Sequence, residues 1–363
     1  MKLMTVPTTI LLLSLAGPIA AQEARAAADV APIGAITAAF RAAAEAQTPA
    51  TSTAQQVPPP ILTPPLTPRR RGSMVGYLED AVIGTKLRVR MERGTGNNSP
   101  DRAEFFYAKC GCYQTLPPSD VNFDPDAPGP REGAASNLDF RQAFVQGEFA
   151  ASDRVSVFAE LPIRWIQPVE FLPGTGGGFE DQGGIGDVRA GVKLALASTL
   201  SQVVTLQLKA FVPTGDSEKG LGTNHASLEP ALVMYHRASD RVAIESQAGL
   251  WLPFSGSAGL PTSSEDQFAG PVLFYGIGPS VEIYRRESVR FGPVLELIGW
   301  RVLGGFQTTP VLGEANGTNI INLKVGARLS WNDADSIYGG WGRSLTDQRW
   351  YEDLLRFEYR RTF

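Results

Sequence analysis

The chain is poor in the residues from which many functional sites are built. Its 363 residues include two cysteines and two histidines, too few for a disulfide scaffold or for a metal site built from histidine. Charged residues make up 19% of the chain, below the roughly 25% usual for a soluble globular protein. The net charge of -4 gives no sign of the basic surface that binds nucleic acid. We therefore predict no metal, no cofactor and no nucleic-acid partner.

Long apolar runs are also missing. No stretch of the sequence reaches the ~18–20 residues that a transmembrane helix needs. The chain instead begins with Lys2, a short apolar stretch at 10–16 and small residues around Ala21, which is the order of a secretory signal peptide. The apolar stretch is too short for a membrane anchor. We predict a signal peptide over 1–21 and an exported mature protein.

The composition changes after the signal peptide. Residues 22–75 are rich in alanine and then in proline, threonine and glutamine, and such a segment buries too little apolar surface to become ordered. Arg69, Arg70 and Arg71 follow the proline-rich part. A run of this kind is typical of a solvated surface, and the alternative is contact with anionic lipid or cell wall. We predict a disordered periplasmic arm over 22–75 and a separate domain over 76–363.

From about residue 76 onward, apolar and polar side chains alternate. Odd-numbered residues from Val155 to Trp165 are apolar, whereas the even-numbered ones include Glu160 and Arg164. Because successive side chains of a strand point to opposite faces, this period of two indicates strands with one apolar face. Twelve such segments are predicted, at about 81–93, 138–150, 154–165, 184–197, 202–212, 226–237, 241–253, 270–285, 288–303, 318–331, 335–345 and 350–363.

The connections between these segments are alternately short and long. Tight turns occur near 151–153, 198–201, 239–240, 286–287 and 332–333, and the intervening links are long and rich in glycine and proline. This alternation is typical of an outer-membrane barrel with short periplasmic turns and longer extracellular loops. A soluble β-sandwich also alternates but does not separate short from long connections. We predict an all-β, transmembrane up-and-down antiparallel β-barrel of about 12 strands, in the outer membrane of a Gram-negative-type bacterium.

Aromatic residues gather at the ends of the predicted strands, where outer-membrane barrels carry lipid-facing girdles. These residues are Trp165, Trp251, Trp300, Trp331, Trp350 and Tyr351. The chain ends on Phe363, and alternating aromatics before it resemble the C-terminal signal read by the barrel assembly machinery; Arg361 departs from that pattern. We expect outer-membrane lipid and that machinery as partners.

The polar face of the predicted strands lines the lumen if the apolar face meets lipid. The predicted lumen residues are Lys86, Arg88, Arg90, Glu92, Arg154, Glu160, Arg164, Arg189, Lys193, Lys209, Lys324, Arg328, Arg356, Glu358 and Arg360. Charges of both signs indicate a wet interior, because unpaired ions in a dry one are costly. Basic groups outnumber acidic ones in this set, which favours an anion or an acidic solute. The alternative is a closed barrel whose interior charges only pair with one another.

Two glycine-containing motifs resemble a known family. Residues 183–193 (GGIGDVRAGVK) and 211–216 (FVPTGD) are similar to the exported barrel family labelled putative MetA-pathway of phenol degradation. The resemblance covers about 138–363 and implies an outer-membrane transporter for aromatic or other small organic solutes. The glycines also have a purely structural explanation, because they let strands bend and loops turn at a barrel rim.

An enzymatic alternative starts from Asn224, His225 and Ser227, with Glu229 close behind. Outer-membrane lipid A deacylases and phospholipases resemble this segment in combining histidine with serine. A serine nucleophile needs a base within hydrogen-bond reach, and a third group must orient that base. On one strand face the two Cα atoms lie ~6.5–7 Å apart. We predict no catalytic residue, and His225 and Ser227 are the residues that test the alternative lipid esterase.

The two cysteines, Cys110 and Cys112, lie in the long first loop. Thiols outside the inner membrane tend to oxidise. A local disulfide, a metal or redox site and two free thiols are the three options. We favour the disulfide, because two thiolates without nearby histidine or further cysteine make a weak metal site.

Overall fold

The computed structural model describes residues 72–100, 110–254, 268–286, 288–308 and 313–363. The signal peptide predicted over 1–21 and most of the arm predicted over 22–75 lie outside the described residues. The helices of the described part include none that is long and apolar enough to cross a membrane.

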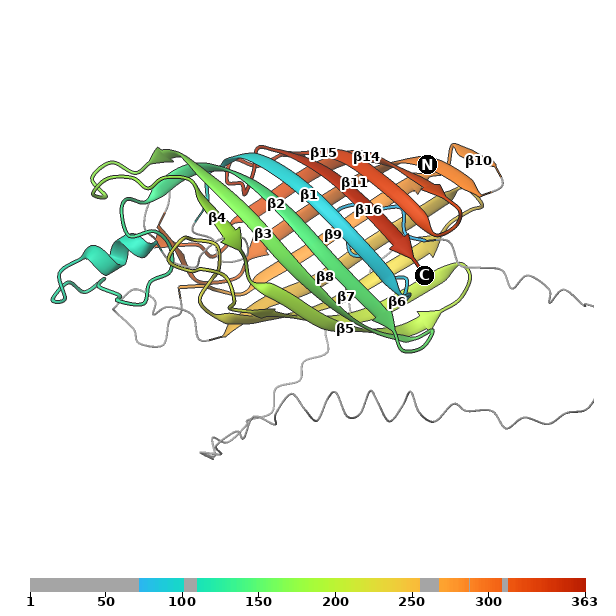
Figure 1. Ribbon diagram of the computed structural model, residues 1–363, viewed down its shortest axis with the longest axis horizontal. Coiled ribbons are helices and arrows are strands. Elements are labelled where there is room, and N and C mark those ends of the chain that lie inside the picture. Colours follow the sequence, from blue (N-terminus) through green and yellow to red (C-terminus); the bar gives the residue numbers. More distant parts are fainter. Residues whose placement is uncertain (1–71, 101–109, 255–267, 287, 309–312) are drawn as a thin grey trace, which may run out of the picture. The chain divides into compact units, whose positions relative to one another are not determined.

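Twelve antiparallel strands form a closed ring (Figure 1). The ring runs through β1 (Lys86–Asn97), β2 (Ala135–Ala150), β3 (Val155–Phe171), β5 (Val188–Ser198), β6 (Gln202–Val212), β7 (Ala226–Arg237), β8 (Val242–Phe254), β9 (Val272–Val281), β11 (Val289–Val302), β14 (Asn319–Trp331), β15 (Asp335–Ser344) and β16 (Asp353–Thr362). Pairing of β1 with β16 closes it. The predicted all-β barrel is confirmed, and the soluble sandwich is wrong.

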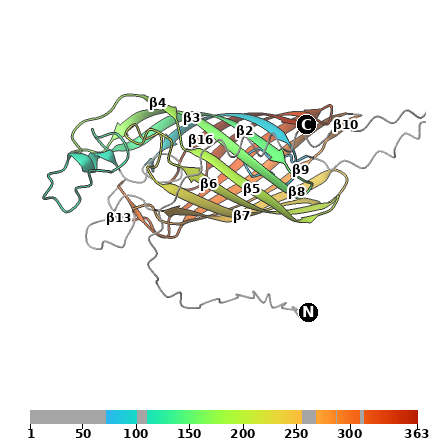
Figure 2. The same cartoon turned by 60° about the horizontal axis from the view of Figure 1, so that its bottom comes forward.

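Short elements decorate the ring. β4 (Gln182–Ile185) pairs with residues Ile163–Ile166 of β3, and β10 (Tyr284–Arg286) pairs with β11. β12 (Phe306–Gln307) and β13 (Gly313–Glu314) form a separate hairpin, and η1 (Gly111–Thr115) is a single 3₁₀ turn. Figure 2 shows β4 and β13 at the same end of the barrel, which we call the long-loop end. The opposite end, with the tight turns and the C-terminus, is the short-turn end.

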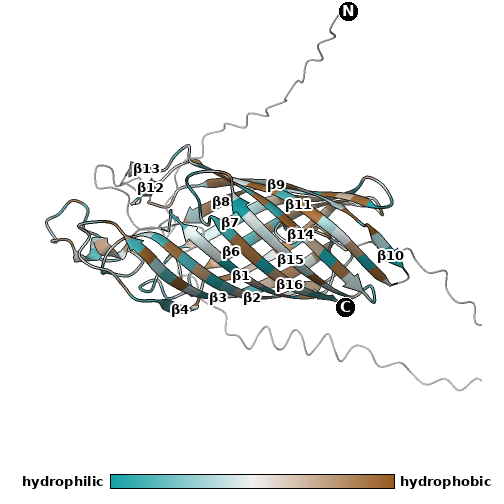
Figure 3. Cartoon of the chain, turned by 90° about the horizontal axis from the view of Figure 1, so that it is seen from above, coloured by the Kyte–Doolittle hydropathy of each residue, from teal (hydrophilic) through white to brown (hydrophobic). Residues whose placement is uncertain are grey.

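Hydrophobic and hydrophilic residues alternate along the strands of the wall, as the coloured bands of Figure 3 show. On β3, Leu161 and Trp165 are exposed on the outside, whereas Glu160 and Arg164 are buried inside. A closed ring leaves no unpaired strand edge, so its backbone polar groups are satisfied within lipid. An apolar exterior around an ionised interior is the arrangement of outer-membrane barrels. The protein therefore lies in the outer membrane.

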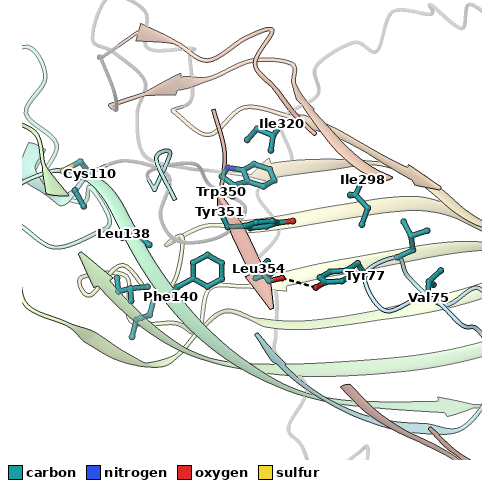
Figure 4. Close-up of a cluster of buried hydrophobic side chains, with 14 of the residues drawn as sticks. Val75, Tyr77, Cys110, Leu138, Phe140, Ile298, Ile320, Trp350, Tyr351 and Leu354 are labelled. Carbon is teal, nitrogen blue, oxygen red and sulfur yellow. Dashed lines mark hydrogen bonds between the residues drawn. The ribbon is translucent and has the colours of Figure 1, made fainter. Parts of the chain in front are cut away.

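Four of the six aromatic residues assigned to the lipid-facing girdle turn inward. Trp251, Trp350 and Tyr351 are buried, and Trp300 packs edge-on against Trp350 with 4.9 Å between ring centroids. Figure 4 shows Trp350 and Tyr351 inside the barrel. The prediction was wrong for Trp251 and Trp300 because they lie on the inward face of β8 and β11, and for Trp350 and Tyr351 because they lie in the loop before β16 and pack inward.

Candidate functional site: a plugged lumen

Fourteen of the fifteen side chains predicted for the lumen lie inside the barrel wall. Arg154 differs: it lies in the tight turn before β3 and is exposed. Its parity along the chain matches the interior residues Ser156 and Glu160. The strand begins only at Val155, however, so Arg154 stands at the short-turn rim in solvent.

Residues 73–82, which we call the plug segment, fill the short-turn half of this interior. Asp80 contacts Lys86 at the start of β1 and Arg360 near the end of β16, at 2.6 and 3.2 Å. Tyr77 reaches further in, where its hydroxyl donates to the carbonyl of Leu354 at 3.4 Å, as Figure 4 shows. The other end of the segment also lies near the short-turn end, where Arg360 donates to the carbonyl of Ser73. The plug segment thus enters and leaves by the short-turn end.

Carboxylates of the wall accept the backbone N–H groups of the plug segment. Glu296 on β11 accepts from Tyr77 at 2.9 Å and from Leu78 at 2.8 Å. Glu245 on β8 accepts from Met74 at 2.8 Å. A buried N–H without a partner costs about 1–3 kcal/mol, so these two acids hold the plug segment in its path.

Basic side chains of the wall bind the carbonyl groups of the same segment. Arg328 on β14 donates to Met74 at 3.0 Å and to Val75 at 2.7 Å. Lys193 donates to the Asp80 carbonyl at 3.0 Å. The plug is therefore held by its backbone as well as by its apolar side chains, which pack in the interior. The boundary expected between residues 75 and 76 falls inside this segment.

Most of the remaining interior charges form ion pairs, whereas Lys324 lies over the ring of Tyr77, with 3.9 Å to the centroid. Arg328 contacts Glu358 at 2.8 Å, with both side chains at most 1% exposed. Lys209 contacts Glu79 of the plug segment and Glu229 of β7, both at 2.7 Å. Breaking such a buried pair leaves an uncompensated charge. The short-turn half of the lumen is thus filled and largely neutralised.

Several interior acids were missed by the sequence reasoning. They are Glu148, Glu229, Glu245, Glu282 and Glu296. Glu148 and Glu229 lie on strands whose alternation is irregular in sequence, and their faces become clear only from the register with β3 and β6. With these acids, and with Glu79 and Asp80 of the plug segment, the interior excess of basic groups on which an anion preference was predicted largely disappears.

A cavity of about 150 Å³ lies beside the tip of the plug segment. Guanidinium and ammonium groups line it together with aromatic rings: Arg88, Arg90, Arg189, Lys209, Arg356, Tyr77, Phe144, Phe211, Trp251, Phe274 and Trp300. Three carboxylates also line it: Glu79 and Glu229, which pair with Lys209, and Glu92, which pairs with Arg356. Arg90 lies over the ring of Phe144, with 4.1 Å to the centroid. Within the described residues, the buried Nε groups of Arg189 and Arg356 have no hydrogen-bond partner. These donors remain to be satisfied, as does the Nε of Arg360, which contacts the plug segment and has no partner among the described residues.

His225 and Ser227 also face the interior, and both are buried. The hydroxyl of Ser227 lies 3.4 Å from His225 Nδ1, a long contact. Burial lowers the pKa of His225. In the described part of the chain its Nε2 has no partner, and the nearby Asp187 instead accepts from Gly215 and Thr223. Among the described residues, no carboxylate forms a hydrogen bond with the histidine, and the pair does not face the lipid.

In the first loop, Cys110 and Cys112 form a disulfide around η1. The described residues contain no cluster of three or more side chains suited to a metal ion. The disulfide fixes a loop whose Cys110 and Tyr113 are buried with the interior apolar cluster.

Comparison with known proteins gives only distant likenesses. No family profile matches the chain, and no curated protein matches it. Similar solved structures include an outer membrane channel from Pseudomonas putida F1 (TM-score 0.48, 13% identity, 77% of this chain and 96% of that one) and the NanC porin (0.42, 8%, 76% and 98%). LpxR from Salmonella typhimurium is another (0.40, 9%, 77% and 100%). At these scores the likenesses carry no argument about function, and the resemblance to the phenol-degradation family stays a prediction.

Proposed function

We propose that the protein is an outer-membrane channel for small organic anions, which the plug segment closes at rest. The observation that carries this proposal is the cavity beside the plug tip, where buried guanidinium groups with spare donors adjoin aromatic rings. A barrel that served only as a closed structural element gains nothing from leaving such donors unpaired, because each costs free energy.

The lining of the cavity selects the class of solute. A carboxylate fits the spare donors of Arg189 and Arg356, since charge-assisted hydrogen bonds to guanidinium are the strong ones. Phe144, Phe211 and Trp300 offer flat apolar surfaces for the rest of the solute. The volume of about 150 Å³ corresponds to roughly five water molecules at ~30 Å³ each. A small carboxylate with one ring or a short chain fits these limits.

Passage requires the plug segment to move. Many of its contacts are hydrogen bonds between its backbone and charged side chains of the wall, and water replaces bonds to charged groups at a net cost of about 1.5–3 kcal/mol each. The segment joins β1 at its short-turn end, so it can withdraw in that direction without breaking the ring.

Conductance in a planar lipid bilayer tests the proposal. The protein is compared with a variant whose residues 73–82 are replaced by a glycine–serine linker of equal length. We expect rare openings from the former and long, stable steps from the latter. The matched control replaces loop residues 172–181 in the same way and keeps the closed behaviour. A linker variant that folds, as judged by its heat-modifiable gel mobility, and yet stays silent contradicts the channel.

The contact between Ser227 and His225 supports a second candidate, a lipid esterase. Because the pair faces the lumen and no described carboxylate orients the histidine, we expect no ester release that depends on Ser227. Ester hydrolysis by the protein that disappears in Ser227→Ala would establish the enzyme instead.

A further inference from the structure

Two arginines lie side by side on the outer surface of the barrel. Arg93 on β1 and Arg141 on β2 are direct partners in the antiparallel register, and both are exposed. The Cβ atoms of such partners lie ~4.5–5.5 Å apart, and like charges placed there destabilise a sheet. Neither guanidinium forms an ion pair or hydrogen bond with any residue that the structure describes. The pair therefore has no bonded counter-charge in the part of the chain that the structure describes.

The register places this pair at the long-loop boundary of the apolar belt. On β1 the outward residues Leu87 and Met91 are exposed and apolar, and Arg93 follows them toward the long-loop end. The row across the neighbouring strands ends in two exposed tryptophans, since it runs Trp341, Leu355, Arg93, Arg141, Trp165. Tryptophan belts mark the interface of a membrane. The arginine pair thus lies at the headgroup level of the outer leaflet.

A groove of about 1080 Å³ adjoins the pair on the same outer surface. Apolar side chains, among them Met91, Ala143 and Phe357, continue it toward the membrane centre in the next row. Asp139 and Asp181 also line it, and Asp139 accepts the backbone N–H of Gly96 at 2.9 Å. The groove therefore offers two guanidinium groups at its interface end and an apolar channel below them.

We propose that this groove binds a phosphate-bearing glycolipid of the outer leaflet, with a phosphate between Arg93 and Arg141 and acyl chain against Met91, Ala143 and Phe357. Guanidinium groups bind phosphate by paired, charge-assisted hydrogen bonds. A phosphate placed between the two arginines removes their mutual repulsion, and a lipid is the molecule that surrounds the barrel at this depth. The binding is independent of channel opening, because the groove lies outside the lumen.

Native mass spectrometry of the full-length protein in detergent measures the binding, with diphosphorylated lipid A as the probe. The double variant Arg93→Gln with Arg141→Gln is expected to bind lipid A at least roughly tenfold more weakly, since hydrogen bonds to charged groups contribute ~1.5–3 kcal/mol. The matched control is Arg301→Gln, another exposed arginine at the long-loop end, which stands opposite Asn319 and donates to it at 3.2 Å. We expect the control to bind as the unaltered protein does.

Two further arms identify the ligand. Lipid A without phosphates is expected to lose as much affinity for the unaltered protein as the double variant loses for intact lipid A. Ala143→Trp fills the floor of the groove and is expected to weaken lipid binding while both arginines remain. Heat-modifiable gel mobility verifies that each variant is folded.

Three results overturn the proposal. The first is a folded double variant that binds lipid A within about twofold of the unaltered protein. The second is equal binding of phosphorylated and dephosphorylated lipid. The third is full displacement of the lipid by millimolar inorganic phosphate, which identifies a site for the free ion and not for a lipid.

Discussion

The two halves of the lumen are built from similar residues but are completed differently. In the short-turn half, the plug segment supplies the partners: its N–H groups meet Glu245 and Glu296, and its carbonyls meet Arg328. Beyond the plug tip the wall pairs its own charges, as Arg189 does with Glu160 at 3.0 Å, and the Nε of Arg189 is left without a partner among the described residues. The difference teaches that the plug segment meets the interior charges in one half, whereas beyond its tip the wall meets them mainly with charges of its own.

Removal of Arg328 is expected to have the largest effect on the filled half. Arg328→Met leaves Glu358 with one fewer cation and two plug carbonyls without a donor. Breaking a buried pair costs about 3–5 kcal/mol, and we expect a loss of this size in the free energy of unfolding, measured by urea titration with tryptophan fluorescence. Arg343→Met, at an exposed ion pair of the rim, is the control. A loss below about 1 kcal/mol in Arg328→Met would show that the plug does not depend on this side chain.

Glu296→Leu is expected to loosen the plug while the ring stays closed. The substitution leaves the N–H groups of Tyr77 and Leu78 without their acceptor, at about 1–3 kcal/mol each. The predicted result is a higher open probability in bilayer recordings, in the direction of the glycine–serine linker variant. Glu352→Leu, on an exposed carboxylate outside the lumen, controls for loss of charge alone. Unchanged gating in a folded Glu296→Leu protein argues against the plug as the gate.

Arg189→Gln tests the cavity beside the tip of the plug segment. Glu160 keeps Arg90 as a partner at 3.3 Å, so we expect little loss of stability. The affinity for benzoate, read from the block of current through the linker variant, is expected to fall by roughly tenfold, the value of one charge-assisted hydrogen bond. Equal block by benzoate before and after the change would place the recognition elsewhere in the lumen.

The smallest effect is expected at the rim, where neither half of the lumen is involved. Arg131 and Glu218 lie 3.7 Å apart and are more than half exposed. Arg131→Ala is expected to alter the free energy of unfolding by less than about 0.5 kcal/mol, because solvent screens such pairs. The same urea titration measures it, and a larger change would mean that the loops carry more of the stability than their exposure indicates.

The wall of the barrel could be predicted from sequence because its signal is local. Alternation along β5 and β6 identified Lys193 and Lys209 as interior residues without any knowledge of their neighbours. The same parity carries a signal that was not used: Trp251 stands an even number of positions from the interior residue Glu245, and both are buried. Strand parity decides where Trp251 points, whereas Trp350 and Tyr351 are consecutive, both buried and outside the strands, so parity does not place them.

The plug segment could not be predicted because nothing local marks it. Residues 73–82 follow a proline-rich stretch and do not alternate. The groups that hold them are far away in sequence: Glu245 is 171 positions from Met74, and Arg328 is 254. The cavity beside the plug tip depends on the same long-range assembly. Only closure of the ring brings these side chains around one short segment.

Asp80 of the plug segment has a consequence for the order of assembly. The seam of the barrel joins the first strand to the last, and it places Arg88 directly opposite Arg360. Asp80 contacts Lys86 on one side of the seam and Arg360 on the other, so its carboxylate bridges the first and the last strand of the barrel. Closing the seam without it brings cations together, and seating it before closure leaves it half paired. Closure of the seam and seating of the plug segment therefore favour each other, and we expect the two to occur in one cooperative step.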